Sequence, residues 1–186
     1  MNFLLSCVTI NDDMNNGNKL SYYDKATREL MERATAYNDI MVGEYTLPYA
    51  VVALREAFKY KLTYKKVFGE DMFVKHYPSK TDPAQDFCLI SSYYIYSRSG
   101  GDKFWDLKTS GIHTWLQAKN YSEPFDITFT QFVEPQQYEI MTYDYFINNV
   151  FPYKKGRLLT MLRKDKIFLD DVIKSAAILG KCAGLE

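Results

Sequence analysis

The chain has 186 residues, long enough for a hydrophobic core, and we expect a single globular domain over residues 1–186. Hydrophobic residues make up 47% and charged residues 25% of it, which excludes an intrinsically disordered protein. The formal net charge is zero, so no overall field attracts nucleic acid. The three cysteines, at positions 7, 88 and 182, are odd in number and widely spaced. This predicts free thiols in the cytoplasm, or in the host cytoplasm if the protein is viral.

Strand and helix patterns alternate along the first half of the chain. An apolar run at residues 3–10 predicts a buried strand, and apolar positions from Ser21 to Tyr37 fall on one helical face. Residues 39–45 alternate as a strand, Pro48 begins a second helix, and residues 71–77 form a third predicted strand.

The second half begins with the clearest local signal, "TDPAQ". Asp82 at the N-cap, Pro83 and Gln85 predict a helix that ends at the double glycine 100–101. Residues 102–119 are predicted to form another helix, with Trp105 and Trp115 as core residues. A strand at 126–133 and a helical C-terminal third follow.

The order of these elements predicts an α/β domain, or a helix-rich α+β domain, with a small four-stranded, partly parallel sheet covered by helices. The opening "FLLSCVTIN…SYYDKATRELMERATAYNDIMV" resembles in its rhythm the first unit of sugar-nucleotide transferases. That resemblance implies a small transferase or nucleotide-handling enzyme. No DxD motif follows a later predicted strand, so the metal–diphosphate element of those enzymes is missing.

Few residues point to chemistry. The sequence has no paired Cys or His motif for zinc, no GxGxxG and no GxSxG, so we predict no metal and no cofactor. If the protein is an enzyme, the candidate catalytic residues lie at the rim of the predicted sheet, where α/β proteins bind ligands; they are Asp12, Asp13, His76 and Asp86. His113, beside the tryptophans, is interpreted as a packed side chain.

Two basic stretches are candidate contact surfaces. The first, "FKYKLTYKK", offers Lys59 together with Tyr60 and Tyr64, a combination used to bind single-stranded nucleic acid. The second, between residues 153 and 166, follows an acidic stretch without any Lys or Arg at 121–152. It contains Lys154, Lys155, Arg157, Arg163, Lys164 and Lys166. Charges segregated in this way fit self-association or a charged partner.

These observations favour a small interaction protein that binds a protein partner or assembles with itself. Its 16 tyrosines suit such a role, because tyrosine offers contact area at low entropic cost. The composition, rich in Asn, Lys, Tyr and Ile, is typical of virus- or phage-encoded proteins. The alternatives are the transferase or nucleotide-handling enzyme and a nucleic-acid-binding protein. No apolar stretch approaches the roughly 20 residues of a membrane span, so no membrane partner is expected.

Overall fold

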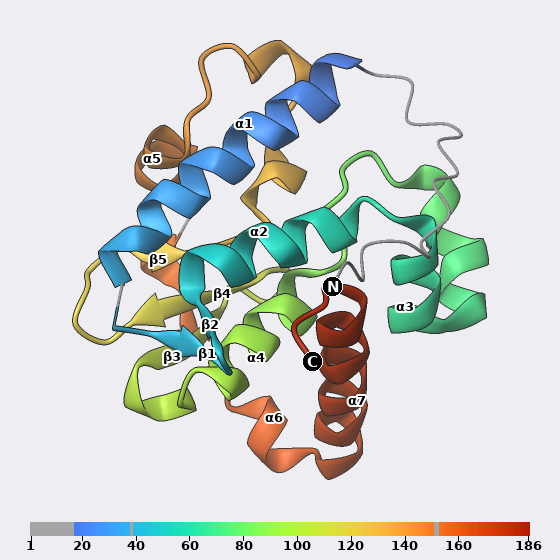
Figure 1. The fold of residues 1–186 in the computed structure, drawn as a ribbon, viewed down its shortest axis with the longest axis vertical. Helices are drawn as coiled ribbons and strands as arrows, with labels where there is room; N and C mark the ends of the chain where they lie inside the picture. The colour runs from blue at the N-terminus through green and yellow to red at the C-terminus, as the bar shows by residue number, and fades with distance from the viewer. Residues whose placement is uncertain (1–16, 38, 151–152) are drawn as a thin grey trace, which may run out of the picture.

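The structure is a computed structural model that describes residues 17–37, 39–150 and 153–186 (Figure 1). Its longer helices are α1 (Gly17–Ala34), α2 (Leu47–Phe58), α3 (Lys61–His76), α4 (Cys88–Arg98) and α7 (Lys166–Cys182). The shorter helical segments are η1 (Thr35–Tyr37), η2 (Tyr77–Ser79), η3 (Gly101–Lys103), η4 (Phe129–Phe132), η5 (Pro135–Gln137), α5 (Tyr143–Tyr145), η6 (Phe146–Val150), η7 (Tyr153–Lys155) and α6 (Met161–Lys164). No helix in the described ranges is long and apolar enough to cross a bilayer.

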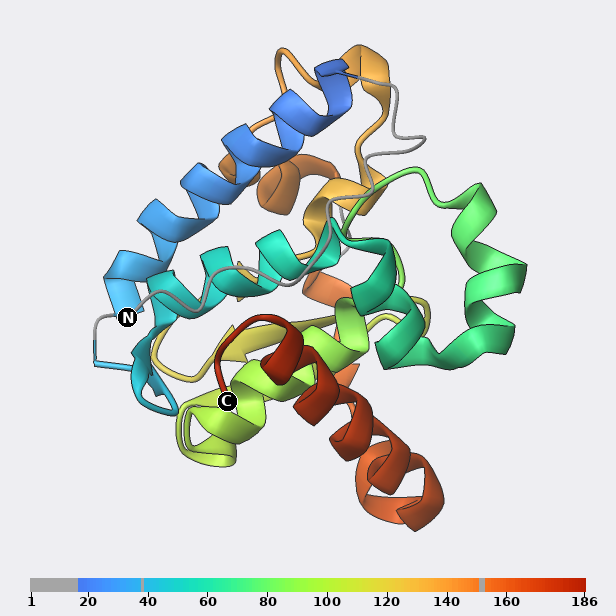
Figure 2. The ribbon, with the colours of Figure 1, turned by 45° about the vertical axis from the view of Figure 1, so that its right-hand side comes forward.

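Helices α1 and α2 form where periodicity predicted them. In α1, apolar residues four apart, such as Tyr22 and Ala26, or Ala26 and Leu30, are buried on one face. In α2, Pro48 stands in the first turn, where its missing N–H costs no hydrogen bond. The two helices lie against each other, α4 packs against α7, and α3 stands at one end of the molecule (Figures 1 and 2).

A buried arginine joins these two helices to the second half of the chain. The Arg55 side chain is fully buried and its guanidinium lies 3.9 Å from the centroid of the Tyr23 ring. Its Nε donates to Thr27 Oγ1 at 2.8 Å, and its Nη1 donates to the carbonyl of Ile127 at 2.5 Å. Arg55 therefore ties α1 and α2 to the segment that follows Phe125.

The four-stranded sheet has the order β5-β4-β3-β6, and every pair is antiparallel. Its strands are β3 (Trp105–Thr109), β4 (Thr114–Ala118), β5 (Pro124–Phe125) and β6 (Arg157–Leu158), and a separate hairpin joins β1 (Met41–Val42) to β2 (Tyr45–Thr46). The expectation of a partly parallel sheet is thus wrong, because tight hairpins, not helical crossovers, connect β3, β4 and β5. Mixed helix and strand content was predicted correctly.

Several element predictions in the described ranges also fail. The predicted strand at 39–45 is the β1–β2 hairpin, and the helix predicted to begin at Asp82 begins at Cys88. The predicted strand at 71–77 is the end of helix α3 and η2, and the predicted strand at 126–133 is largely η4. The predicted helix at 102–119 is the β3–β4 hairpin, which turns at Gly111 with φ +100°. Both tryptophans are nevertheless fully buried, as predicted. The predicted strand at 3–10 lies outside the described residues.

Candidate functional site: a cysteine, a histidine and an aspartate

Cys88 is the first residue of helix α4 and is partly exposed. The first-turn N–H groups of a helix have no intrahelical acceptor, and the helix dipole favours negative charge at this end. An oxyanion formed on a carbonyl that lies beside Cys88 is therefore stabilised at this position.

His113 enters the same site from the hairpin between β3 and β4. Its backbone carbonyl accepts hydrogen bonds from Ser110 N at 3.0 Å and from Thr109 Oγ1 at 2.9 Å, which fix the residue just before β4. The side chain is buried, and Nε2 lies 2.6 Å from Oδ2 of Asp126. The thiol of Cys88 also interacts with this imidazole.

The charge state of the imidazole follows from these contacts. Burial lowers the pKa of His113, but the charge and hydrogen bond of Asp126 and the contact with Cys88 outweigh burial and raise the pKa from 6.5 to about 10. Burial raises the pKa of Asp126, but the charge and hydrogen bond of His113 and hydrogen bonds from Thr128 hold it below its ordinary value. At neutral pH the two residues form an imidazolium–carboxylate pair.

Asp126 follows β5 directly, and four hydrogen bonds hold its carboxylate. Oδ1 accepts from the backbone N and from Oγ1 of Thr128, both at 2.8 Å. Oδ2 accepts from His113 and, at 2.9 Å, from the hydroxyl of Tyr153. The backbone N of Asp126 donates to the hydroxyl of Tyr143 at 2.9 Å. The carboxylate thus orients the imidazole and is itself oriented by residues on both sides of it.

Aromatic rings enclose the imidazole. Phe132 lies edge-on to His113 with ring centroids 4.7 Å apart, and Trp115 lies nearly parallel to it at 6.0 Å. Tyr153 packs edge-on against Trp115 at 5.0 Å. Gly156 completes the packing, because a Cβ atom there would lie 2.2 Å from the indole of Trp115. These apolar walls exclude water, which strengthens the electrostatic interactions inside.

The segment that leads into Cys88 is tightly constrained. Asp86 has φ +74°, the one positive φ of a non-glycine residue in the described ranges, and its carboxylate accepts a hydrogen bond from Tyr64 at 2.7 Å. Backbone strain of this kind is concentrated at functional sites. Asp82 Oδ1 accepts from the backbone N of Ala84 at 2.8 Å and from Thr130 Oγ1 at 3.0 Å, which links this segment to η4.

A buried lysine adjoins the same segment. The ammonium of Lys80 lies 4.8 Å from the ring centroid of Tyr64 and 4.7 Å from that of Phe87. Burial lowers the pKa of Lys80 to about 7, although the charges of Asp82 and Asp86 act in the opposite direction. The loop that precedes Cys88 is therefore held by hydrogen bonds and by cation–π contacts.

The Cys88–His113–Asp126 triad is not arranged as a metal site. In the described part of the chain, no group of three or more His, Cys, Asp and Glu residues is placed to hold a metal ion.

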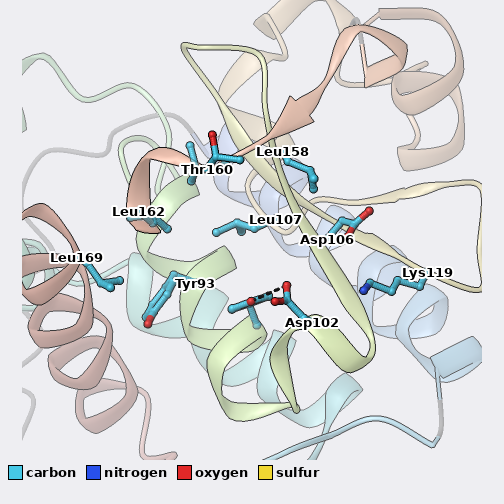
Figure 3. A pocket seen from close by; sticks show the side chains of 11 residues that line it. Tyr93, Asp102, Asp106, Leu107, Lys119, Leu158, Thr160, Leu162 and Leu169 are labelled. Atoms are coloured by element: carbon cyan, nitrogen blue, oxygen red, sulfur yellow. Dashed lines mark hydrogen bonds between the residues drawn. The ribbon is translucent and has the colours of Figure 1, made fainter. Parts of the chain in front are cut away.

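A cavity of about 430 Å³ lies away from the triad, between the β3–β6 edge of the sheet and helices α4, α6 and α7 (Figure 3). Leu107, Leu162 and Leu169 point into it, and acidic and basic groups stand at its rim (Figure 3). The lining residues are Tyr93, Tyr96, Asp102, Asp106, Leu107, Lys119, Leu158, Leu159, Thr160, Leu162 and Leu169. Since no triad residue lines it, this cavity is a separate feature.

Two of the four predicted catalytic residues, His76 and Asp86, lie in the described ranges. Asp12 and Asp13 lie outside the described residues. His76 ends helix α3 instead of a strand, and Asp86 lies two residues before Cys88, bound to Tyr64.

The first basic stretch is interrupted between α2 and α3. Lys59 forms ion pairs with Asp24 and Glu56, both at 2.7 Å, and Tyr60 is the N-cap of α3. Tyr64 is fully buried, so its ring offers no open stacking platform.

The second basic stretch, residues 153–166, is only partly helical. Its residues lie in η7, β6 and α6 and at the start of α7. The side chains of Lys155, Arg157, Lys164 and Lys166 are exposed. Lys154 and Arg163 belong to η7 and α6, and their side chains lie outside the described part.

The sequence analysis missed two of the three triad residues and interpreted the third as packing. Neither Cys88 nor Asp126 was interpreted as functional, because a single cysteine and a single aspartate form no motif with a recognisable spacing. The available signal was the sequence order: a cysteine at the start of an apolar helix, then a histidine and an aspartate beside predicted core residues. No family model, no curated protein and no solved structure matches this chain.

Proposed function

We propose that this protein is a cysteine-dependent enzyme of acyl transfer, which cleaves an amide or ester bond or moves its acyl group to another acceptor. The observation that carries the proposal is the order of contacts from Cys88 through His113 to Asp126. A nucleophile beside a base that is oriented by a third group is the arrangement of activated nucleophiles, and Cys-His-Asn proteases use it on an unrelated sequence.

Each residue has one role in this reaction. His113 already carries its proton at neutral pH, so the Cys88 thiol gives its proton to solvent. The thiolate, beside the imidazolium, forms a bond to the substrate's carbonyl carbon, whose oxygen becomes negative next to the first-turn N–H groups of α4. His113 then protonates the leaving amine or alcohol as the carbonyl re-forms, which leaves an acyl-thioester on Cys88. Water or an amine attacks the thioester and gives its proton to His113, and the Cys88 thiolate leaves. Asp126 stabilises the imidazolium throughout.

The chain provides an internal control for a test of this proposal. Cys88 begins helix α4, whereas Cys182, also partly exposed, ends helix α7, where the helix dipole disfavours a thiolate. The folded protein is treated with iodoacetamide at pH 6, and the rate at each cysteine is measured by peptide mass spectrometry. We expect Cys88 to react at least about 10-fold faster than Cys182. In His113→Gln only the rate at Cys88 should fall, and equal rates in the wild type would refute the proposal.

A second candidate function, docking of an acidic partner, is supported by the C-terminal surface. Four exposed bases, Lys155, Arg157, Lys164 and Lys166, belong to the segment whose Leu158 lines the cavity of Figure 3 and is half exposed. A contact made through these bases weakens at high salt, since the screening length falls to about 3 Å at 1 M. Association of the purified protein with itself or with an acidic protein is measured at low and high salt, for wild type and Lys155→Glu/Lys164→Glu. Binding indifferent to both changes would refute this second function.

A further inference from the structure

Ile112 is the most exposed large hydrophobic side chain in the described part of the chain, with 84% of its surface accessible. It directly precedes His113, so its Cα lies about 3.8 Å from that of the proposed base. Isolated exposed hydrophobic residues are common and by themselves indicate nothing. What distinguishes Ile112 from the other exposed apolar residues is its attachment to the triad.

The hairpin holds Ile112 in place instead of letting it move freely. Gly111 supplies the turn with φ +100°, and its backbone N donates to Thr109 Oγ1 at 3.0 Å. Ser110 N closes the turn by donating to the carbonyl of His113. Ile112 itself makes no backbone or side-chain hydrogen bond to the described residues. The turn therefore presents both an apolar side chain and unused peptide groups on a fixed support.

Resting on the proposed function, we infer that Ile112 is a specificity-determining residue, and that the substrate is peptide-like with an apolar side chain next to the carbonyl that Cys88 attacks. His113 must reach both the thiol and the leaving group, so the substrate chain passes beside the residue joined to His113. The apolar side chain of the substrate covers Ile112 and removes the surface of Ile112 from water. The free N–H and C=O of Ile112 suit an amide-bearing ligand, as in recognition of extended peptides.

The test uses two chloromethyl ketones that differ in one side chain: N-acetyl-leucine chloromethyl ketone and N-acetylglycine chloromethyl ketone. With each, the Cys88 thiolate forms a C–S bond to the CH₂ carbon and chloride leaves. Second-order rates are measured by intact-protein mass spectrometry, with iodoacetamide as a probe that lacks an apolar group. The variants are Ile112→Ser and a matched control, Ile167→Ser, whose isoleucine is 77% exposed at the start of α7.

We expect wild type and Ile167→Ser to prefer the leucine probe by about 10-fold, the gain from partly burying one aliphatic side chain. In Ile112→Ser the preference should fall close to 1, while the rates with the glycine probe and iodoacetamide stay within about twofold of wild type. A preference that survives in Ile112→Ser, or is absent in the wild type although Cys88 reacts rapidly with iodoacetamide, overturns this inference alone. A Cys88 that reacts no faster than Cys182 with iodoacetamide overturns the proposed enzyme function and this inference with it.

Discussion

Replacing Asp126 with asparagine tests whether the carboxylate sets the state of His113. The amide keeps the size of the carboxylate, and its oxygen can still accept both hydrogen bonds from Thr128. The NH₂ group then faces His113, which must accept at Nε2 and carry its proton on Nδ1. This neutral imidazole lacks the positive charge that stabilises a neighbouring thiolate in the wild type.

The magnitude of this change follows from the contacts. The two charge-assisted hydrogen bonds at Oδ2, from His113 and Tyr153, each lose roughly 1 kcal/mol when the acceptor is neutral, so Asp126→Asn should cost about 2 kcal/mol of unfolding free energy. With the charge gone, burial is no longer opposed, and the pKa of His113 should fall from about 10 to below 6.5. Alkylation of Cys88 at pH 7 should slow by about 100-fold.

Three measurements check this prediction. Urea unfolding gives the free energy, peptide mass spectrometry gives the alkylation rate, and NMR titration gives the pKa, since the sequence has only two histidines. Asp144→Asn is the control, because Asp144 is an exposed acid paired with Arg33. If His113 in Asp126→Asn still titrates above pH 9, or if Cys88 reacts as fast as in the wild type, our account of the triad is refuted.

Three further variants test the surroundings of the site. Arg55→Met should lower the free energy of urea unfolding by about 3 kcal/mol, because it leaves buried acceptors without a hydrogen-bond donor. A loss below about 0.5 kcal/mol would contradict the role of Arg55 in joining α1 and α2 to the second half of the chain. Gly156→Ala should destabilise the fold by about 1–3 kcal/mol and slow the alkylation of Cys88, because the new Cβ displaces Trp115. An unchanged alkylation rate and an unchanged urea-unfolding midpoint would contradict this expectation. Between pH 7 and 10 the raised pKa of His113 makes stability fall with pH, whereas the lowered pKa of Lys80 makes it rise. In Lys80→Met only the effect of His113 remains, so the free energy of unfolding should decline by up to about 1.4 kcal/mol per pH unit between pH 7 and 10. An unfolding free energy that does not change with pH in this variant would contradict the raised pKa of His113.

The helices were predictable where one face is apolar and the ends carry local signals. Helix α2 has Pro48 in its first turn, and α1 has apolar residues four apart. These local features were enough to predict both helices from the sequence. The β3–β4 hairpin was read as a helix because its aromatic residues fit either period. Gly111 has a positive φ and forms the turn of this hairpin.

The candidate site was not predictable, because its residues meet only through the tertiary fold. His113 lies 25 positions after Cys88, and Asp126 lies 13 positions after His113 (113 − 88 and 126 − 113). Neither separation corresponds to a helical turn or to a motif. The aspartate reaches the histidine because β5 pairs with β4, with Phe125 opposite Leu116. The thiol meets them because α4 packs against the same sheet.

The energetics of the His113–Asp126 pair favour a chemical role over a structural one. Removing two ionised groups from water costs several kcal/mol, and apolar residues of the same volume often stabilise a core equally well. Stability alone would require only that the carboxylate's acceptors be satisfied, which Thr128, Tyr153 and His113 achieve. It would not require the remaining edge of the imidazole to meet a partly exposed thiol at a helix N-terminus. That third contact is what a proton-transferring site needs, and it is the reason for assigning this buried pair to catalysis.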